Sequence, residues 1–157
     1  LNTEQMQEMM EAAGSCAVTM HRAFDVCADP FEALKKSAEL GVDTILTSGQ
    51  EADCFAGCWL LKKLVQLTDQ NWSDSRRVTI LAGAGVTSAN IAEIAKKTGV
   101  RAFHMSGKRL LESGMRYRNE RVHMGLGSLS EFECYRTDEA EIRRAAEILR
   151  TLGEDGR

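Results

Sequence analysis

The chain has 157 residues, a net charge of −3 and a pI of about 5.7, with 43% hydrophobic and 27% charged residues. This composition is typical of a single globular domain and excludes a disordered chain, which would have fewer apolar residues and a larger net charge. We expect no nucleic acid partner, because phosphate backbones are bound by clustered lysine and arginine. We also expect no membrane insertion, since no apolar stretch approaches the roughly 20 residues that span a bilayer.

The first residues predict an amphipathic helix over 3–13 that ends at Gly14. This segment lacks the basic and apolar regions of a signal peptide, so we expect a cytoplasmic protein. The chain begins with Leu1, inside a predicted helix, rather than with Met. We therefore expect either a fragment of a longer protein or a chain whose start has been removed.

Beyond Gly14, an apolar run, a polar segment and an amphipathic helix follow one another four times. The apolar runs begin near residues 17, 43, 78 and 102, and helices are expected over about 30–40, 51–67, 88–98 and 138–151. A long polar loop is expected between residue 107 and the last helix. Strands that alternate with helices at this spacing predict βαβ units and a parallel sheet. Two α/β architectures fit, an open doubly wound sheet and part of an eight-stranded barrel.

The ends of the predicted strands favour the barrel. Each strand ends in polar or small residues, namely His21-Arg22, Thr47-Ser48-Gly49, Gly83-Ala84-Gly85, and His104 with Ser106. In (β/α)8 barrels the functional rim is built at the carboxyl ends of the strands, whereas an open sheet concentrates its chemistry at one switch point. We therefore expect residues 1–157 to form one domain, a partial (β/α)8 TIM barrel of four consecutive βα units.

Five segments occur in an order that resembles the copper homeostasis protein family CutC. They are VTMHRAFDVCADPFEAL (18–34), ILTSGQEAD (45–53), ILAGAGV (80–86), FHMSG (103–107) and GMRYRN (114–119). The resemblance covers about residues 1–135 and implies strands five to eight of a TIM barrel, its C-terminal half. It implies a cytosolic role in copper homeostasis with Cu(I) bound through soft ligands. The absent first half would be a separate chain, lost to proteolysis, or replaced by a partner half barrel in a dimer.

Three residues at the end of the first strand are candidates for chemistry. His21 would transfer a proton, Asp25 would orient a neighbour, and Arg22 would bind an anionic group. The alternative is a structural salt bridge between Arg22 and Asp25 that fixes the loop.

The next two strand ends are candidates for anion binding. The hydroxyls of Thr47 and Ser48 could hold phosphate or carboxylate, or they could cap a helix. Gly83 and Gly85 precede a predicted helix, where backbone N–H groups can approach an anion closely. The alternative for these glycines is a tight turn between strand and helix.

The last strand and the loop after it complete the candidate rim. His104 and Ser106 alternate along the strand and therefore share a face, so His104 is a third acid–base candidate and Ser106 another anion ligand. The alternative is a hydrogen-bonded core histidine. Arg116 could close over an anionic ligand, or lie in a loop packed on the surface.

The five cysteines are odd in number and irregularly spaced, which is a poor disulfide framework. Cys54 and Cys58 are four residues apart on a predicted helix and would share a face, and Cys27 lies near the rim. Soft thiolates of this kind could bind Cu(I). The alternative is a set of buried, inert thiols, because the stretch around Cys54 is apolar.

Three functions remain open on the sequence. The chain could be a copper homeostasis factor that binds Cu(I), a barrel enzyme acting on a small anionic or phosphorylated substrate, or a dimerising scaffold without catalysis. The expected partners are a copper ion or a small anion, together with a second copy of the chain or the absent N-terminal half. The sequence names no reaction.

Overall fold

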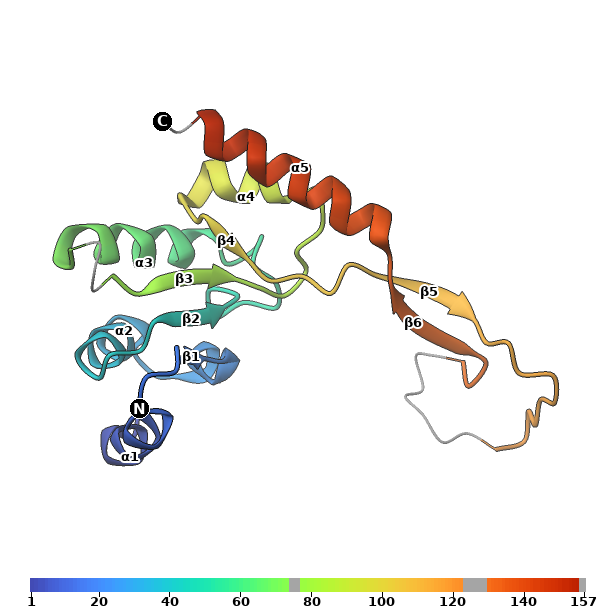
Figure 1. The fold of residues 1–157 in the computed structure, drawn as a ribbon, viewed down its shortest axis with the longest axis horizontal. Coiled ribbons are helices and arrows are strands. Elements are labelled where there is room, and N and C mark those ends of the chain that lie inside the picture. The colour runs from blue at the N-terminus through green and yellow to red at the C-terminus, as the bar shows by residue number, and fades with distance from the viewer. Residues whose placement is uncertain (74–76, 123–129, 156–157) are drawn as a thin grey trace.

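The structure is a computed structural model that describes residues 1–73, 77–122 and 130–155. It contains a four-stranded sheet covered by helices and a two-stranded hairpin that projects from this body (Figure 1). The strands of the sheet are β1 (Thr19–Met20), β2 (Thr44–Thr47), β3 (Thr79–Ala82) and β4 (Ala102–Phe103). The helices are α1 (Thr3–Ala13), α2 (Pro30–Glu39), α3 (Cys58–Asn71), α4 (Ile91–Thr98) and α5 (Glu139–Asp155), and a 3-10 helix, η1, spans Arg22–Val26.

The order of the strands decides between the two expected architectures. All four strands are parallel and lie in the order β1-β2-β3-β4, so each strand pairs with its successor along the chain. The connecting helices α2, α3 and α4 lie along one side of the sheet (Figure 1). A doubly wound sheet reverses its order at a switch point and carries helices on both faces. The observed order is that of a barrel section, which confirms the predicted partial (β/α)8 fold.

The hydrophobic core lies between the sheet and these helices. On β2 and β3 the side chains of Ile45 and Ile80 are buried, whereas those of Leu46 and Leu81 on the opposite face are only half-buried. The helices contribute buried aliphatic residues that include Leu34, Leu61, Leu64, Ile91 and Ile94. Because a parallel sheet in a closed barrel is buried on both faces, the inner face of this sheet is partly open in the described chain.

The helix boundaries follow local capping where the sequence provides it. Asp29 accepts hydrogen bonds from the N–H groups of Phe31 (2.9 Å) and Glu32 (3.0 Å), with Pro30 in the first turn. These bonds satisfy donors that have no partner inside a helix. Helix α1 ends at Gly14 as predicted. Within the described ranges, no helix has both the length and the apolar composition required to cross a membrane.

Helix α3 begins later than predicted, at Cys58 instead of near residue 51. The carboxylate of Asp53 accepts hydrogen bonds from the N–H groups of Phe55 and Ala56, which holds this segment in a turn. The backbone of Gly57 also lies directly against that of Ser48, where a side chain would collide. The prediction that Cys54 and Cys58 share a helix face is therefore wrong, because Cys54 lies in the preceding turn.

The segment predicted as a polar loop forms the hairpin. Strands β5 (Lys108–Glu112) and β6 (Glu133–Thr137) pair antiparallel, with Leu110 opposite Tyr135. This segment shows no alternation of apolar and polar residues, because the strands bury almost none of their side chains. Contacts across the hairpin, rather than burial of one face, therefore support these strands.

Candidate functional site

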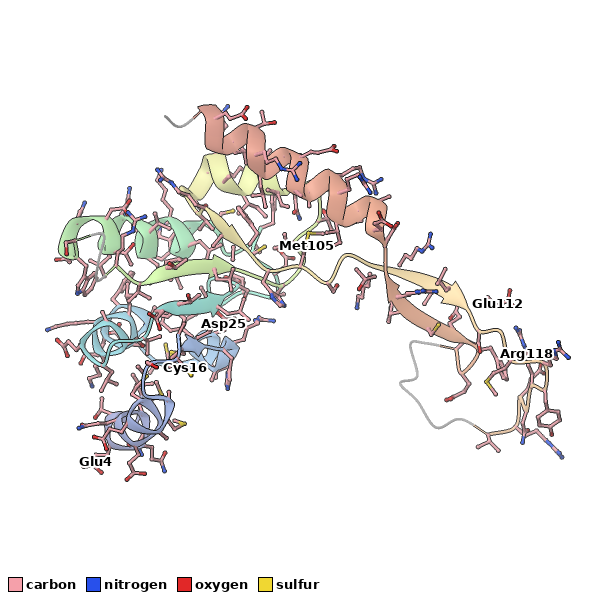
Figure 2. The ribbon with its side chains drawn as sticks, viewed as in Figure 1. Glu4, Cys16, Asp25, Met105, Glu112 and Arg118 are labelled. Carbon is pink, nitrogen blue, oxygen red and sulfur yellow. The ribbon has the colours of Figure 1, made fainter. Side chains whose placement is uncertain are left out.

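The rim at the carboxyl ends of the strands is organised around Asp25, which lies in η1 directly after β1 (Figure 2). Its carboxylate accepts hydrogen bonds from five donor groups and its side chain is only 7% exposed. The donors are the Thr47 hydroxyl (2.5 Å), Arg22 Nε (2.7 Å), the Ser48 hydroxyl (3.0 Å), and the N–H groups of Ser48 (3.1 Å) and Gln50 (3.2 Å). Asp25 thereby ties η1 to the end of β2.

This environment keeps Asp25 ionised. Burial raises the pKa of Asp25, but the hydrogen bonds from Thr47, Arg22, Ser48 and Gln50 together outweigh burial and hold the pKa below its ordinary value of 3.8. A carboxylate that is ionised at neutral pH and fully hydrogen-bonded is suited to orient neighbours rather than to carry protons.

Three predicted anion ligands take part in this hydrogen-bond network, namely Arg22, Thr47 and Ser48. Of the three, only Arg22 is exposed at the surface. Thr47 and Ser48 are fully buried, and the Ser48 hydroxyl also lies 2.6 Å from the Glu51 carbonyl oxygen. Arg22 donates from Nε to Asp25 and from Nη2 to Ser48 (2.8 Å), and its side chain is 45% exposed. Of these three predicted anion ligands, the structure therefore presents Arg22 to a ligand and uses the two hydroxyls inside the protein.

Four of the predicted site residues line one open pocket of about 650 Å³ on this rim, namely Arg22, Gly85, His104 and Ser106. Lys108 and Arg144 add two cations to its wall, and Asp138 and Glu141 add two carboxylates. Sequence reasoning missed these four charged residues. Lys108 falls in the segment predicted as a loop, and the other three lie at or near the start of α5, for which only the apolar face was considered.

The loop after β3 leaves backbone donors free beside this pocket. Ala84 and Gly85 both have positive φ angles, 72° and 75°, a conformation that is unfavourable for alanine. The loop is held by its carbonyls, since Cys54 N–H donates to Ala84 O (3.0 Å) and Asn90 Nδ2 donates to Gly85 O (2.8 Å). Within the described chain, the N–H groups of Gly85 and Val86 donate to no acceptor.

Gly83 was predicted with Gly85 to bind an anion, but the structure gives it a different role. Its N–H donates to the Thr47 carbonyl (3.0 Å) and so extends the sheet pairing. A Cβ atom at this position would lie 2.6 Å from Leu46 Cδ1. Gly83 therefore permits close packing between β2 and β3, and its N–H is not available to an anion.

The two candidate histidines occupy different positions. His21 Nδ1 accepts a hydrogen bond from the Ala23 N–H (3.0 Å) and caps η1, which assigns the proton of the neutral ring to Nε2. His21 does not line the rim pocket, whereas His104 is exposed and does. His104 is thus the histidine that the fold brings to the same pocket as Arg22.

A carboxylate from α5 also binds beside the loop after β3. Glu141 accepts hydrogen bonds from the Ser88 N–H (2.6 Å) and hydroxyl (2.9 Å), and Arg144 Nη2 lies 2.8 Å from the same carboxylate. The Ser88 N–H and then Arg144 lower the pKa of Glu141. This part of the rim therefore already accommodates one oxyanion from the protein itself.

The three candidate metal ligands are protonated thiols in partly or fully buried positions. Burial raises the pKa of Cys27, Cys54 and Cys58, that of Cys54 to about 11. Cys58 Sγ lies 3.5 Å from the Cys54 carbonyl oxygen, and Cys27 Sγ lies 3.5 Å from Gln50 Nε2. Among the residues that the structure describes, no three side chains of His, Cys, Asp or Glu come together as a metal-binding group. The described donors therefore fit a copper ion poorly, because a thiol must lose its proton to bind metal.

Arg116 lies away from the rim pocket. It is exposed and follows β5, and its neighbours Glu112 and Arg118 lie on the projecting hairpin (Figure 2). Arg118 forms an ion pair with Glu112 (2.6 Å). Arg116 is not among the residues that line the rim pocket, so the predicted closure over a ligand is not formed in this structure.

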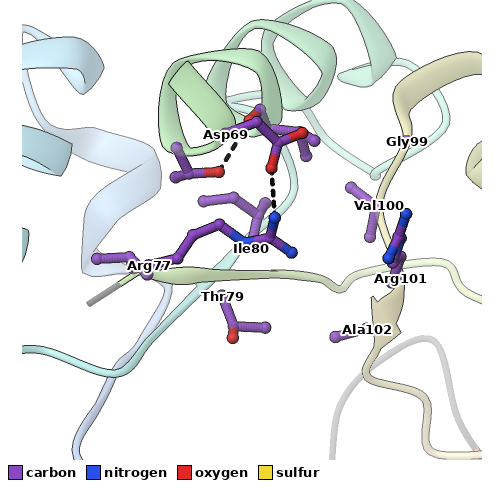
Figure 3. A pocket seen from close by; sticks show the side chains of 11 residues that line it. Asp69, Arg77, Thr79, Ile80, Gly99, Val100, Arg101 and Ala102 are labelled. Carbon is purple, nitrogen blue, oxygen red and sulfur yellow. Dashed lines mark hydrogen bonds and ion pairs between the residues drawn. The ribbon is translucent and has the colours of Figure 1, made fainter. Parts of the chain in front are cut away.

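A smaller pocket, of about 180 Å³, lies at the opposite end of the sheet between α3, β3 and the start of β4 (Figure 3). Asp69 and Arg77 form an ion pair of 2.7 Å across it, and Arg101 lies on its other side. Conserved chemistry in barrels is found at the carboxyl ends of strands, whereas the amino ends serve stability. We therefore assign this pocket a structural role.

Comparison with known proteins identifies the family. The family model described as the CutC family matches residues 1–109. The chain is 45% identical over 139 residues to a family protein CutC of Parabacteroides distasonis, covering 88% of this chain and 55% of that protein. It is 47% identical over 145 residues to one of Bacteroides fragilis, covering 92% and 55%, and 40% identical over 150 residues to one of Salmonella agona, covering 95% and 57%.

A solved structure supports the same assignment. The putative copper homeostasis protein CutC of Streptococcus agalactiae superposes with a TM-score of 0.59 and 27% identity, over 66% of this chain and 49% of that one. This chain spans about half the length of the curated relatives that it matches. The chain belongs to the CutC family, and its four βα units are a section of a TIM barrel.

Proposed function

We propose that the rim pocket of this CutC-family chain binds a small anionic ligand through a carboxylate or phosphate group. The observation that carries the proposal is the combination of the Arg22 guanidinium with the free N–H groups of Gly85 and Val86 on one rim. Asp25 and Ser48 use Arg22 Nε and Nη2, which leaves Nη1 for a ligand. A guanidinium fixed in this way loses little conformational freedom when it binds an oxyanion.

The preference for an anion rests on Arg22 and on the free backbone N–H groups, because the other charges in the wall balance. Arg144 is bonded to Glu141, and the wall also contains one further cation, Lys108, and one further acid, Asp138. His104 is the acid–base candidate that lines the same pocket as Arg22, with Asp25 as the residue that orients Arg22. These roles fit a barrel enzyme acting on a small anionic or phosphorylated substrate.

A phosphate titration followed by ¹H–¹⁵N NMR at constant ionic strength tests this proposal. We expect the amide signals of Gly85 and Val86 to shift, and Arg22→Gln to weaken phosphate binding at these amides about tenfold or more, because a charge-assisted bond is lost. Arg101→Gln, at the opposite end of the sheet, is the matched control and should leave these shifts unchanged. Shifts at Gly85 that are absent, or that persist unchanged in Arg22→Gln, would refute the proposal.

A second candidate function is direct Cu(I) binding, which the family and the name of the Streptococcus agalactiae relative favour. Cys54 and Cys58 are the proposed pair and Cys27 the alternative thiol. Because their raised pKa values mean that bound copper must displace protons, binding should strengthen as the pH rises. Because every cysteine must lose its proton to bind Cu(I), binding to an ordinary thiol also strengthens with pH, but for thiols with a raised pKa the rise continues to a higher pH.

A Cu(I) titration of the reduced protein without oxygen tests the copper proposal. We expect the double variant Cys54→Ser with Cys58→Ser, or failing that Cys27→Ser, to abolish stoichiometric binding. Cys134→Ser is the control, because Cys134 is an exposed thiol on the hairpin. Binding that survives in all of these variants, or no binding by the native chain, would rule out these cysteines as ligands.

The proposed partner is a further half barrel, either a second copy of this chain in a homodimer or the N-terminal half, and the proposed location is the cytoplasm. The half-buried Leu46 and Leu81 on the inner face of the sheet support this partner. Light scattering of the purified chain tests the homodimer. A dimer whose anion site stays empty would instead favour a scaffold without catalysis.

A further inference from the structure

Two arginines face each other across the β5–β6 hairpin. The register pairs Arg109 directly with Arg136, and both residues are exposed. Like charges directly opposite on neighbouring strands destabilise a sheet. Within the described part of the chain, neither guanidinium forms a hydrogen bond or an ion pair. The fold thus holds two uncompensated positive charges side by side.

The surroundings of this pair leave its charge unbalanced. Arg109 and Arg136 line an open pocket of about 490 Å³ together with Arg143, from the first turns of α5. Of the two acids that line this pocket, Glu139 pairs with Arg143 (2.6 Å), and Asp138 accepts a hydrogen bond from the neutral Ala140 N–H (3.0 Å) and keeps its charge. One carboxylate cannot neutralise two guanidinium groups, so an external anion can take up the remaining positive charge.

Two other cations of the same hairpin are satisfied within it. Lys108 Nζ lies 4.0 Å from the centre of the Tyr135 ring, and Arg118 pairs with Glu112 and packs over the Phe132 ring. Cation–π contacts and ion pairs of this kind stabilise exposed charges locally. The Arg109–Arg136 pair differs from these neighbours because it has no partner among residues 1–73, 77–122 and 130–155.

We propose that Arg109 and Arg136 form a second oxyanion site that binds a phosphoryl group. Two planar guanidinium groups from adjacent strands can each donate two parallel hydrogen bonds to one tetrahedral dianion. A phosphate dianion would also cancel the repulsion between the two arginines, so binding should stabilise the hairpin. The site lies on the hairpin and does not depend on the ligand proposed for the rim pocket.

Phosphate titration of the whole chain in chloride buffer of constant ionic strength tests this site through the side-chain Nε–Hε signals of the arginines. We expect the signals of Arg109 and Arg136 to shift on phosphate addition, and Arg109→Gln or Arg136→Gln to weaken this binding about tenfold or more. Arg150→Gln is the matched control, because Arg150 is exposed on α5 outside this pocket. Arg22→Gln should leave these signals unchanged, so failure of the rim site and failure of this site are distinguished.

Thermal unfolding provides a second measurement. Without phosphate, Arg136→Gln should keep or raise the Tm, because it removes a repulsion, and it should lose the phosphate-dependent rise of the native chain. The inference is wrong if phosphate and chloride act alike on the native chain, or if Arg150→Gln weakens binding as much as Arg136→Gln. It is also wrong if poly-glutamate, but not phosphate, shifts the Arg109 and Arg136 signals, since that result would indicate an acidic protein partner.

Discussion

Both ends of the sheet carry an arginine–aspartate pair with the same 2.7 Å separation, yet the two pairs differ in their surroundings. At the carboxyl end, the side chain of Asp25 is 7% exposed and accepts hydrogen bonds from five donor groups. One of these donors, Arg22, lines the rim pocket. At the amino end, the side chain of Asp69 is 51% exposed and that of its partner Arg77 is 35% exposed (Figure 3).

The distance within an ion pair therefore does not measure how much the pair contributes to the free energy of unfolding. An exposed pair contributes little stability, because water screens the charges and both side chains lose conformational freedom. A buried carboxylate contributes to stability by accepting hydrogen bonds from buried donors. Removing the carboxylate leaves buried donors without a partner, which costs free energy. At the carboxyl end, a single side chain thus fixes the geometry of the candidate site.

The largest expected effect follows from removing these carboxylates. Asp25→Ala should lower the free energy of unfolding by about 3–5 kcal/mol, since it leaves the buried Thr47 hydroxyl and the Ser48 N–H without an acceptor. Asp69→Ala should cost about 1 kcal/mol or less. Urea denaturation of both variants measures the difference, and equal losses would show that the two ends are not distinct.

A smaller effect is expected from glycines at the two ends. Gly57→Ala should cost about 2–3 kcal/mol, because an added Cβ would overlap the backbone of Ser48. Gly99→Ala, at the amino end, should cost about 1–2 kcal/mol, because an added Cβ would make only an ordinary contact with Val65 (3.5 Å) but the φ angle is 79°. Thermal unfolding measures both costs, and a larger cost for Gly99→Ala would contradict the tighter packing of the rim.

The loss of stability at acid pH is a further test of the role of Asp25 at the carboxyl end. Asp25 has a pKa below its ordinary value of 3.8, so its contribution is complete above that value and is lost as the pH falls through the lower, folded pKa. Asp25→Asn should therefore flatten the loss of stability at acid pH. Measuring the free energy of unfolding between pH 2 and 7 tests this prediction. The prediction is wrong if stability falls with pH in Asp25→Asn as steeply as in the native chain.

The smallest expected effect is on the pH dependence of stability at alkaline pH. The buried thiol of Cys54 has its pKa raised from 9.0 to about 11, so the folded chain keeps a proton that the unfolded chain releases. The contribution is present below pH 9 and is lost as the pH rises through about 11. Cys54→Ala should remove this dependence, whereas Cys134→Ala, at an exposed thiol, should keep it. Unfolding measured between pH 8 and 11 compares the two variants.

Local patterns predicted much of the fold and part of the site. The alternation of apolar runs with amphipathic segments gave the βα order, and Asp29 with Pro30 gave the start of α2, because capping depends only on neighbours in the chain. The polar strand ends correctly placed Arg22, Gly85, His104 and Ser106 on one rim, because parallel strands bring their carboxyl ends together. The hairpin escaped prediction, since its strands bury neither face and show no period of two.

Periodicity and local hydrogen bonding were sufficient to predict the order of the βα units, the parallel direction of β1 to β4 and the polar character of the rim. The division of the polar residues into internal ones and ones that face a ligand became visible only in the folded chain. Thr47 and Ser48 are buried against Asp25 while Arg22 is exposed, although all three lie at the carboxyl ends of strands. The physical reason is that burial and hydrogen-bond satisfaction arise between residues distant in the chain, which no local pattern records.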